Sequence, residues 1–474
     1  MAKMITGMNE DYSKWYIDIV TNAELADYSP VKGCMVIRPN GYALWENIQR
    51  ILDGMFKETG HRNAYFPLLI PESFMRREAE HVEGFAPECA VVTHGGGKKL
   101  EENLYIRPTS ETIIWSMYSK WINSYRDLPL LINQWANVLR WEMRTRLFLR
   151  TTEFLWQEGH TAHAEAGEAE EEAVRMIDIY REFCEKYLAL PVLKGKKTDK
   201  EKFAGAVHTY TIEAMMQDRK ALQAGTSHNL GQNFARAFNV TFLDRNGERK
   251  LVWATSWGVS TRLIGALIMA HSDDNGLVVP PKIAHIDCVI IPIWKKEEDR
   301  VKVLEFSSNL YSELKNRKVN AVYDDADQYK PGWKFAQYEM LGVPLRIEIG
   351  PREVEQEKVV IVRRDNREKT ACSLDRVHEA ILEISERMQR ELYEKAKNMM
   401  ESNTSETDNL QGLENNMEKG GFFKINWCGK KSCEDYFQDR MKATIRLIDS
   451  ECTTRRCIVC GDPSSHTVIV SRSY

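Results

Sequence analysis

Residues 140–154, RWEMRTRLFLRTTEF, combine arginines and carboxylates with hydroxyl and aromatic side chains. An arginine guanidinium can bind a phosphate through two parallel hydrogen bonds, and an aromatic ring provides a flat surface for a nucleotide base. In a strand, residues two apart share a face. A returning strand would therefore place on one face Arg150, Thr152, Phe154, Trp156 and Glu158. The alternative is a solvated ladder of opposite charges, with Arg140, Glu142 and Arg144 on its outer face. Both readings stay open at this point.

A second group of reactive side chains lies near the C-terminus. Five of the ten cysteines fall there, namely Cys428, Cys433, Cys452, Cys457 and Cys460. Two close pairs of thiolates, Cys428 with Cys433 and Cys457 with Cys460, suit tetrahedral zinc. In a cytosolic chain such clustering favours a metal over disulfides. The alternative is a set of reduced thiols without a ligand, and Cys452 complicates the count as a fifth thiol.

Apolar periodicity predicts the elements that must position these residues. A helix is expected over residues 40–59, behind an Asn40 cap, with apolar side chains at helical spacing: Leu44, Ile48, Ile51, Leu52 and Met55. Residues 61–73 indicate a strand interrupted by prolines. Residues 137–158 alternate between apolar and polar types, which predicts two antiparallel strands joined by a short turn. Residues 165–188 predict a helix with an acidic start.

Length and composition restrict the class of protein. A chain of 474 residues should contain about three domains. No apolar run reaches the roughly 18 residues that a membrane span needs, and the N-terminus does not resemble a signal peptide, so we expect a cytoplasmic protein without membrane contact. The net charge of −4 means that any polyanion must be bound by local patches.

Three segments, in the order found here, resemble the motifs of the class II aminoacyl-tRNA synthetases. Residues 40–71 are similar to motif 1, a long helix followed by a strand with a proline. Arg140, Glu142, Arg150 and Phe154 resemble motif 2, R-x-E followed by a loop and R-x-x-x-F. The stretch GVSTRLIGALIMAH places Arg262 as motif 3 does, at an apolar helix. Each motif is degenerate alone, but their order is specific.

Further stretches narrow the resemblance to the prolyl-tRNA synthetases of the archaeal and eukaryotic type. RPTSET, residues 107–112, is similar to the T-x-E signature of the proline, threonine, serine, glycine and histidine subgroup. GTSHNLGQNF, residues 225–234, and VPPKIAHIDCVIIPI look like the prolyl family itself. The segment between QEGH and GTSH is too short for the large editing insertion of the bacterial type. The resemblance covers essentially the whole chain.

The resemblance implies a multidomain protein of mixed α/β and α+β class. The expected parts are a class II catalytic domain with an antiparallel sheet over residues 1–284 and an α/β anticodon-binding domain over residues 285–395. A polar connection over residues 396–420 precedes a small α+β zinc-binding domain over residues 421–474. Motif 1 implies a homodimer.

The resemblance also assigns roles to individual residues. Arg140 and Arg262 would be the catalytic residues, acting on the phosphates of ATP. The proline site would consist of Thr109, Glu111, Arg140, Trp156 and His228. The ATP site would consist of Arg140, Glu142, Thr152, Phe154, Gln223, Thr226, Ser260 and Arg262. From the residues alone, Thr109 and Glu111 could instead form a helix capping box, and His228 could be a hydrogen-bonded structural histidine.

The remaining expectations concern cofactors and partners. ATP with Mg²⁺ and structural Zn²⁺ are implied. The zinc would be held by Cys428, Cys433, Cys457 and Cys460; Cys452 is left out because the second pair of zinc ligands in the family is the closely spaced pair. For tRNA(Pro) contact the candidates are Arg144, Arg146, Lys334, Glu339 and Arg346, although each could be a surface charge without a ligand. We expect two-step ligation of L-proline through prolyl-adenylate, with weak activation of cysteine or alanine because a small apolar pocket discriminates poorly.

Two other hypotheses remain. One is a synthetase of the same subgroup that is specific for glycine, threonine or histidine. The other is a binding protein that keeps the fold without catalysis. The second would be expected to lose the motif arginines, yet Arg140 and Arg262 are both present together with Glu111 and Phe154.

Overall fold

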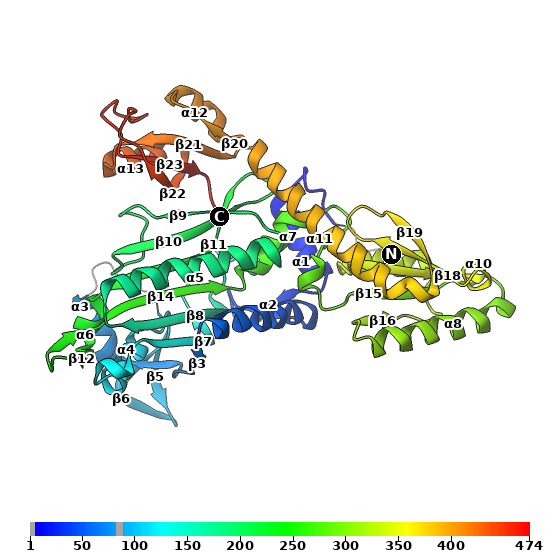
Figure 1. The fold of residues 1–474 in the computed structure, drawn as a ribbon, viewed down its shortest axis with the longest axis horizontal. Helices are drawn as coiled ribbons and strands as arrows, with labels where there is room; N and C mark the ends of the chain where they lie inside the picture. Colours follow the sequence, from blue (N-terminus) through cyan, green and yellow to red (C-terminus); the bar gives the residue numbers. More distant parts are fainter. Residues whose placement is uncertain (1–4, 82–88) are drawn as a thin grey trace.

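The computed structural model describes residues 5–81 and 89–474, which are organised around an 11-stranded sheet (Figure 1). Neighbouring strands follow one another across this sheet in the order β20 (Thr404–Glu406), β21 (Phe422–Trp427), β23 (His466–Ser471), β22 (Thr444–Glu451), β9 (Val192–Lys196), β10 (His208–Met215), β11 (Ala221–Gly231), β14 (Trp253–Ser260), β8 (Glu153–His163), β7 (Leu130–Leu139) and β3 (Arg62–Asn63). The strands from β7 to β9 pair antiparallel. The antiparallel catalytic sheet expected from the sequence is therefore present.

Helices cover one face of this sheet and bury the main core. They are α1 (Tyr12–Asn22), α2 (Pro39–Glu58), α5 (Ala166–Lys186) and α7 (Arg262–His271). In α2 the buried side chains include Leu44, Ile48 and Leu52, as the spacing predicts. The expected Asn40 cap is wrong: Pro39 is the first helical residue, and its restricted backbone suits that position without a capping side chain. The predicted helix α5 is confirmed, with a capping box between Glu165 and Glu168.

The two predicted strands β7 and β8 exist, but their connection differs from the expectation. Their pairing ends at Leu139 and Glu153, and residues 140–152 form a loop instead of a short turn. Leu147 and Phe148 of this loop are buried in the main core, and Phe148 takes a positive φ of 62°. Burial of these two apolar side chains stabilises the loop. The alternating face expected for Arg140, Glu142 and Arg144 is therefore wrong.

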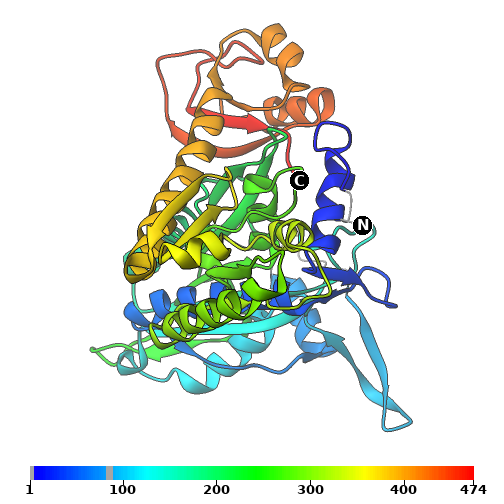
Figure 2. The same cartoon turned by 90° about the vertical axis from the view of Figure 1, so that its right-hand side faces the viewer.

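A second core lies toward the far end of the sheet, and α4 (Glu111–Trp121), α6 (Asn233–Phe238), β12 (Thr241–Leu243) and β13 (Arg249–Leu251) contribute to it. A separate three-stranded sheet of β4 (Leu69–Pro71), β6 (Lys98–Ile106) and β5 (Val91–Gly95) lies nearby with α3 (Glu72–His81), which contacts α4 and α6. In Figure 2 the β5–β6 hairpin extends outward from the body of the molecule. A short hairpin of β1 (Ala26–Tyr28) and β2 (Met35–Ile37) precedes α2.

The next domain is the small α/β unit that the sequence predicts. Its five-stranded sheet has the order β16 (Ala321–Tyr323), β15 (Cys288–Pro292), β17 (Leu345–Ile349), β18 (Lys358–Arg363) and β19 (Lys369–Ser373). Its helices are α8 (Glu297–Asn316), α9 (Pro331–Met340), α10 (Pro351–Glu355) and α11 (Val377–Ser402). The inner strand β15 is a fully buried apolar run, which explains its strong sequence signal, whereas β17 alternates buried apolar residues with the half-buried Arg346 and Glu348.

The segment expected as a polar connection is structured. Helix α11 continues to Ser402, and β20 and α12 (Leu410–Met417) follow it directly. Leu413 and Met417 are buried in the core of the C-terminal unit, together with α13 (Lys431–Met441). Strand β22 of this unit pairs with β9 of the catalytic sheet through Ile448 and Lys196. Figure 1 shows α11 running from the α/β domain to this C-terminal unit.

No helix within residues 5–81 and 89–474 is long and apolar enough to cross a membrane.

Candidate active site

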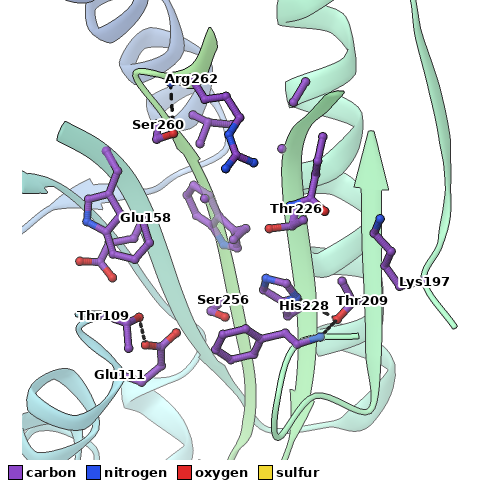
Figure 3. A pocket seen from close by; sticks show the side chains of 18 of the residues that line it. Thr109, Glu111, Glu158, Lys197, Thr209, Thr226, His228, Ser256, Ser260 and Arg262 are labelled. Carbon is purple, nitrogen blue, oxygen red and sulfur yellow. Dashed lines mark hydrogen bonds between the residues drawn. The ribbon is translucent and has the colours of Figure 1, made fainter. Parts of the chain in front are cut away.

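A cavity of about 300 Å³ opens on the face of the sheet opposite α5. Strands β8, β10, β11 and β14 form its floor, and the N-terminus of α4 closes one end (Figure 3). Alternate residues of β8 point into it, from Phe154 through Trp156 and Glu158 to His160. Four residues of its lining carry a buried polar atom that has no hydrogen-bond partner among the described residues: Trp156 Nε1, His160 Nδ1, Ser256 Oγ and Trp257 Nε1. Buried polar atoms are usually paired, so a polar ligand is expected here.

Arg140 lies where the loop leaves β7 and lines the cavity. Its Nε donates to the carbonyl oxygen of Pro108 at 2.9 Å, and its guanidinium lies 5.5 Å from the ring centroids of Phe154 and Trp156. Neither Nη nitrogen has a protein hydrogen-bond partner within the described part of the chain. Burial by the surrounding protein atoms lowers the pKa of the Arg140 guanidinium. The residue is nevertheless accessible to solvent through the open side of the cavity. The guanidinium is thus anchored on one side and free to bind an anion on the other.

Two carboxylates meet in the cavity near the start of α4, Glu111 from the helix and Glu158 from β8. Ser110 is the N-cap residue of α4 but makes no side-chain capping bond; its hydroxyl donates to Glu158 instead. Thr109 donates to Glu111, so the capping-box interpretation of these two residues is wrong. Gln134 donates to Glu158 at 2.8 Å. Thr109 and Glu111 therefore present a hydroxyl and a buried carboxylate to a ligand, which suits an ammonium group (Figure 3).

Two histidines of the cavity have opposite electrostatic environments. Burial, reinforced by the neighbouring His160, lowers the pKa of His228 to about 3, so its ring is neutral. His228 Nδ1 lies 3.0 Å from Thr209 Oγ1, and the residue also lines the cavity, which combines the structural and the ligand interpretations. Burial opposes the charge of His160, but its 2.9 Å contact with Glu158 and the nearby Glu111 raise the pKa of His160.

The other side of the cavity carries Arg262 at the first residue of α7. Its Nε donates to the carbonyl oxygen of Leu149 at 3.2 Å, and burial together with Arg150 and Arg140 lowers its pKa. Close to it in Figure 3 are Ser260, whose hydroxyl accepts from the Arg262 backbone N–H at 3.2 Å, and Thr226. Gln223 lines the same cavity. The structure thus gathers most predicted ATP and proline residues around one space.

Two predicted ATP residues lie outside the cavity lining. Glu142 forms an ion pair with the exposed Arg150 at 3.1 Å in the loop. Thr152 is buried, and its backbone N–H donates to the carbonyl oxygen of Gly33 at 2.8 Å. The face predicted to unite Arg150 and Thr152 with Phe154 is therefore wrong for the first two, because β8 begins at Glu153.

Sequence reasoning missed several lining residues, among them His160, Lys197, Phe203, Thr209 and Ser256. His160 could have been found, because the alternation of Phe154, Trp156 and Glu158 continues to it. Lys197 directly follows β9 and Thr209 lies in β10, and only the sheet topology reveals that these strands lie next to each other, with β10 beside β11.

The candidate tRNA residues are placed in different surroundings. Arg144 is exposed in the loop, whereas Arg146 lies 4.8 Å from the ring centroid of Tyr16 and 5.6 Å from that of Tyr474. Lys334 is buried and contacts Asp324 at 2.9 Å.

In the α/β domain Arg346 forms ion pairs with Glu339 and Glu348, each at 2.9 Å. Arg346 and Glu339 are largely buried by side chain, so both already have internal partners. In their predicted role Arg346 and Glu339 would have to bind tRNA bases while forming an ion pair with each other.

The four expected cysteines meet in space. The sulfur atoms of Cys428, Cys433, Cys457 and Cys460 all lie within 4.8 Å of one another, and Cys428 Sγ is 3.7 Å from both Cys433 Sγ and Cys460 Sγ. A tetrahedral Zn–S bond of about 2.3 Å implies sulfur atoms about 3.8 Å apart, so the geometry fits a bound metal. Cys452 lies outside this group.

Comparisons with known proteins agree with this arrangement. Three family profiles match: the tRNA synthetase class II core domain (G, H, P, S and T) at residues 93–271, an anticodon binding domain at residues 287–384, and the prolyl-tRNA synthetase C-terminal domain at residues 410–474. Proline–tRNA ligases of Chlorobium luteolum, Prosthecochloris aestuarii and Chlorobaculum tepidum are each 58% identical over 484 residues, covering 100% of both chains. The chain therefore belongs to the class II prolyl-tRNA synthetases.

Proposed function

We propose that the protein joins L-proline to tRNA(Pro) in two steps at the cavity of Arg140 and Arg262. The observation that carries this proposal is the meeting, in one cavity, of an ammonium site, Thr109 with Glu111, and the Arg140 guanidinium, whose Nη nitrogens have no hydrogen-bond partner among the described residues. The proline–tRNA ligases that match over the full chain support the choice of amino acid.

In the first step a carboxylate oxygen of proline attacks the α-phosphorus of ATP, and pyrophosphate leaves. In the second step a ribose hydroxyl of the tRNA 3′ end attacks the acyl carbon of prolyl-adenylate, and AMP leaves. No protein nucleophile is needed, so catalysis consists of positioning and charge stabilisation. Arg140 would stabilise the charge that develops at the α-phosphate, Arg262 would hold the γ-phosphate of a bent ATP, and Phe154 would pack against adenine.

Class II synthetases use Mg²⁺ with ATP, and the ion would supply positive charge between the phosphates. Within the described residues, the metal-ligating cluster is made of cysteines, not carboxylates. ATP oxygens would therefore hold most of the magnesium, as is usual for this ion, with Glu142 as the candidate carboxylate from the loop.

Pyrophosphate exchange with each of the twenty amino acids tests the proposal. Proline-dependent exchange is expected to dominate. Dominant exchange with glycine, threonine or histidine would favour a different specificity of the same subgroup, and no exchange with any amino acid would favour a binding protein.

The same assay tests the proposed weak activation of alanine and cysteine. Alanine and cysteine are no larger than proline, and an apolar pocket rejects such substrates by only about 1–3 kcal/mol per methylene. We therefore expect measurable exchange with alanine or cysteine at high concentration. Exchange that stays strictly proline-dependent would contradict this expectation.

We further propose that the enzyme is of the archaeal and eukaryotic type. Between β8 and β11 the chain forms α5, β9 and β10, all part of the catalytic domain, which leaves no separate insertion domain there. The same proposal places Lys334, Glu339 and Arg346 at the anticodon and Arg144 and Arg146 near the acceptor end.

Zinc is our proposed metal for the cysteine cluster, because sulfur separations of 3.7 Å match tetrahedral thiolate coordination. Four thiolates leave no open position for catalysis, so the role is structural.

A cytoplasmic homodimer completes the proposal. The hairpin that precedes α2 exposes Tyr28, Val31 and Val36, which are 62%, 63% and 50% accessible. Such neighbouring apolar side chains are a candidate interface beside motif 1. Sedimentation equilibrium should give twice the mass of 54.9 kDa, and a monomer at micromolar concentration would contradict the proposal.

A further inference from the structure

A buried cluster of three charged side chains joins the cavity to the C-terminal unit. Glu213 of β10 is fully buried, and its carboxylate accepts from Lys197 Nζ at 2.8 Å and from Thr211 Oγ1 at 3.0 Å. Arg446 of β22 donates to the same carboxylate through Nε at 3.1 Å and Nη2 at 2.9 Å. One carboxylate thus holds a cation from each of two domains.

Lys197 is the member of this cluster that lines the cavity, and its backbone N–H donates to the carbonyl oxygen of Thr209 on β10, the strand next to the one that carries Thr226 and His228 (Figure 3). Glu213 pairs across the strands with Gln223, which also lines the cavity. The cluster therefore lies at the edge of the proposed reaction site.

Arg446 connects the cluster to the end of the chain. Its Nη1 donates to Thr444 Oγ1 at 2.9 Å and to Ser473 Oγ at 3.0 Å. Ser473 in turn forms a bridge with Ala221 at the start of β11. The C-terminal unit consequently contacts the catalytic sheet through buried groups next to the cavity.

The charges of the cluster do not cancel. Lys197, Arg446 and the nearby Arg262 are three cations, whereas the carboxylates beside them are Glu213 and the less buried Glu201. One positive charge is left over in a largely buried place, and such an excess is costly without an anion. Burial, followed by Arg446, lowers the pKa of Lys197, whereas Lys197 and Arg446 overcome burial and lower the pKa of Glu213. A phosphate oxygen of a bound substrate would neutralise the excess, and a lysine ammonium is a suitable point charge for phosphate.

We propose that Glu213 is a positioning residue of the ligation reaction, which holds the Lys197 ammonium toward a substrate phosphate and links it to Arg446 of the C-terminal unit. This inference rests on the proposed function. The phosphate belongs either to ATP or to the tRNA 3′ end, and the two sources can be distinguished by assay. The C-terminal unit thereby acts on the cavity through one buried carboxylate.

The test compares Glu213→Gln, Arg446→Met and Lys197→Met with a matched control. Asp435→Asn also removes an ion pair between the C-terminal unit and the catalytic domain, since Asp435 contacts Lys200 at 2.7 Å, but it lies away from the cavity lining. We expect each of the three variants to lower kcat/KM by about 10- to 100-fold, the size usual for an outer partner of a site, and the control by less than about twofold. Lys197→Arg should recover part of the loss.

The kinetic constants identify the phosphate. A raised KM for ATP in pyrophosphate exchange assigns it to ATP. Unchanged exchange with a raised KM for tRNA in aminoacylation assigns it to the tRNA end. Adding Arg446→Met to Lys197→Met should cause little further loss, because both act through the same ammonium. An independent, multiplicative loss would overturn the link between the two.

The pH profile separates this role from a purely structural one. The charged groups that face Lys197 are Glu213 from β10, Arg446 from β22 and Glu201 from the segment after β9. Without the Glu213 carboxylate, burial and Arg446 would lower the pKa of Lys197 further, so the alkaline limb of kcat/KM should move to lower pH in Glu213→Gln.

Two results would overturn the inference while leaving the proposed function intact. One is an active wild type whose variants match Asp435→Asn in kcat/KM, even if their melting temperatures fall. The other is an alkaline limb that does not move. If Glu213→Gln does not fold, Lys197→Met still decides the test. It removes the excess buried positive charge and keeps the Glu213 carboxylate that pairs with Arg446. A wild type without proline-dependent exchange would overturn both proposals together.

Discussion

Replacing Arg140 with alanine should remove the main charge stabilisation at the α-phosphate. The Pro108 carbonyl occupies Nε at 2.9 Å, which leaves the two Nη nitrogens to face the cavity. Each charge-assisted hydrogen bond is worth about 1.5–3 kcal/mol in total, but only the part gained in the transition state accelerates the reaction. The loss of one such donor group costs about 10²–10³ in rate, or about 2.7–4 kcal/mol.

The measurement is proline-dependent pyrophosphate exchange at saturating ATP and proline. Arg140→Lys should recover only part of the activity, because an ammonium keeps the charge but cannot both contact Pro108 and present a fork. Arg245→Ala serves as the control, since Arg245 is exposed and packs on Tyr125 away from the cavity. A loss in Arg140→Ala of less than about tenfold, with unchanged melting temperature, would refute the assigned role.

Three further outcomes can be checked with simple variants. Arg144→Ala should leave pyrophosphate exchange unchanged and slow aminoacylation several-fold, since this exposed arginine is free to meet tRNA; a fall in both rates would place it at ATP. Cys460→Ser, or a strong chelator, should release bound zinc and lower the melting temperature, whereas Cys452→Ser should do neither, and equal losses in both variants would count against a four-sulfur site. Burial lowers the pKa of His271 to about 4, below the unfolded value of about 6.5, so the native state should lose about 1.4 kcal/mol per pH unit as pH falls from 6.5 toward 4. His271→Gln should remove that slope, as measured by urea unfolding at several pH values, and an identical slope would show that His271 titrates normally.

Several parts of the site could be predicted because their signals are local. Arg262 is the first residue of an apolar helix, and Thr109 and Glu111 lie at the start of another, so the family resemblance of short stretches was sufficient to identify them. The cysteine pairs are similarly local, and their spacing together with the family resemblance predicted which four converge. The position of Glu142 and Thr152 outside the cavity lining could not be read from local spacing, because residues 140–152 form a loop whose Leu147 and Phe148 are buried in the main core, and β8 begins only at Glu153.

The C-terminal unit shows the same limit on a larger scale. The polar composition of residues 396–420 indicates a connection, yet α12 is held there by Leu413 and Met417 in a core built mainly from later residues. Two apolar side chains are sufficient to hold a short helix when a neighbouring apolar surface is available, and the composition of the segment does not reveal that surface.

The sequence by itself determined the chemical inventory: the motif arginines, the T-x-E pair, the four thiolates and the α/β pattern of the middle domain. These features depend on residue type and short spacing, which the chain carries directly. Only the tertiary structure decided that β9 pairs with β22, that Lys197 reaches the cavity, and that Glu213 joins it to Arg446. Glu213 is 16 positions from Lys197 and 233 positions from Arg446 in the sequence. The energy of both contacts depends on how deeply the groups are buried, which no local sequence pattern shows.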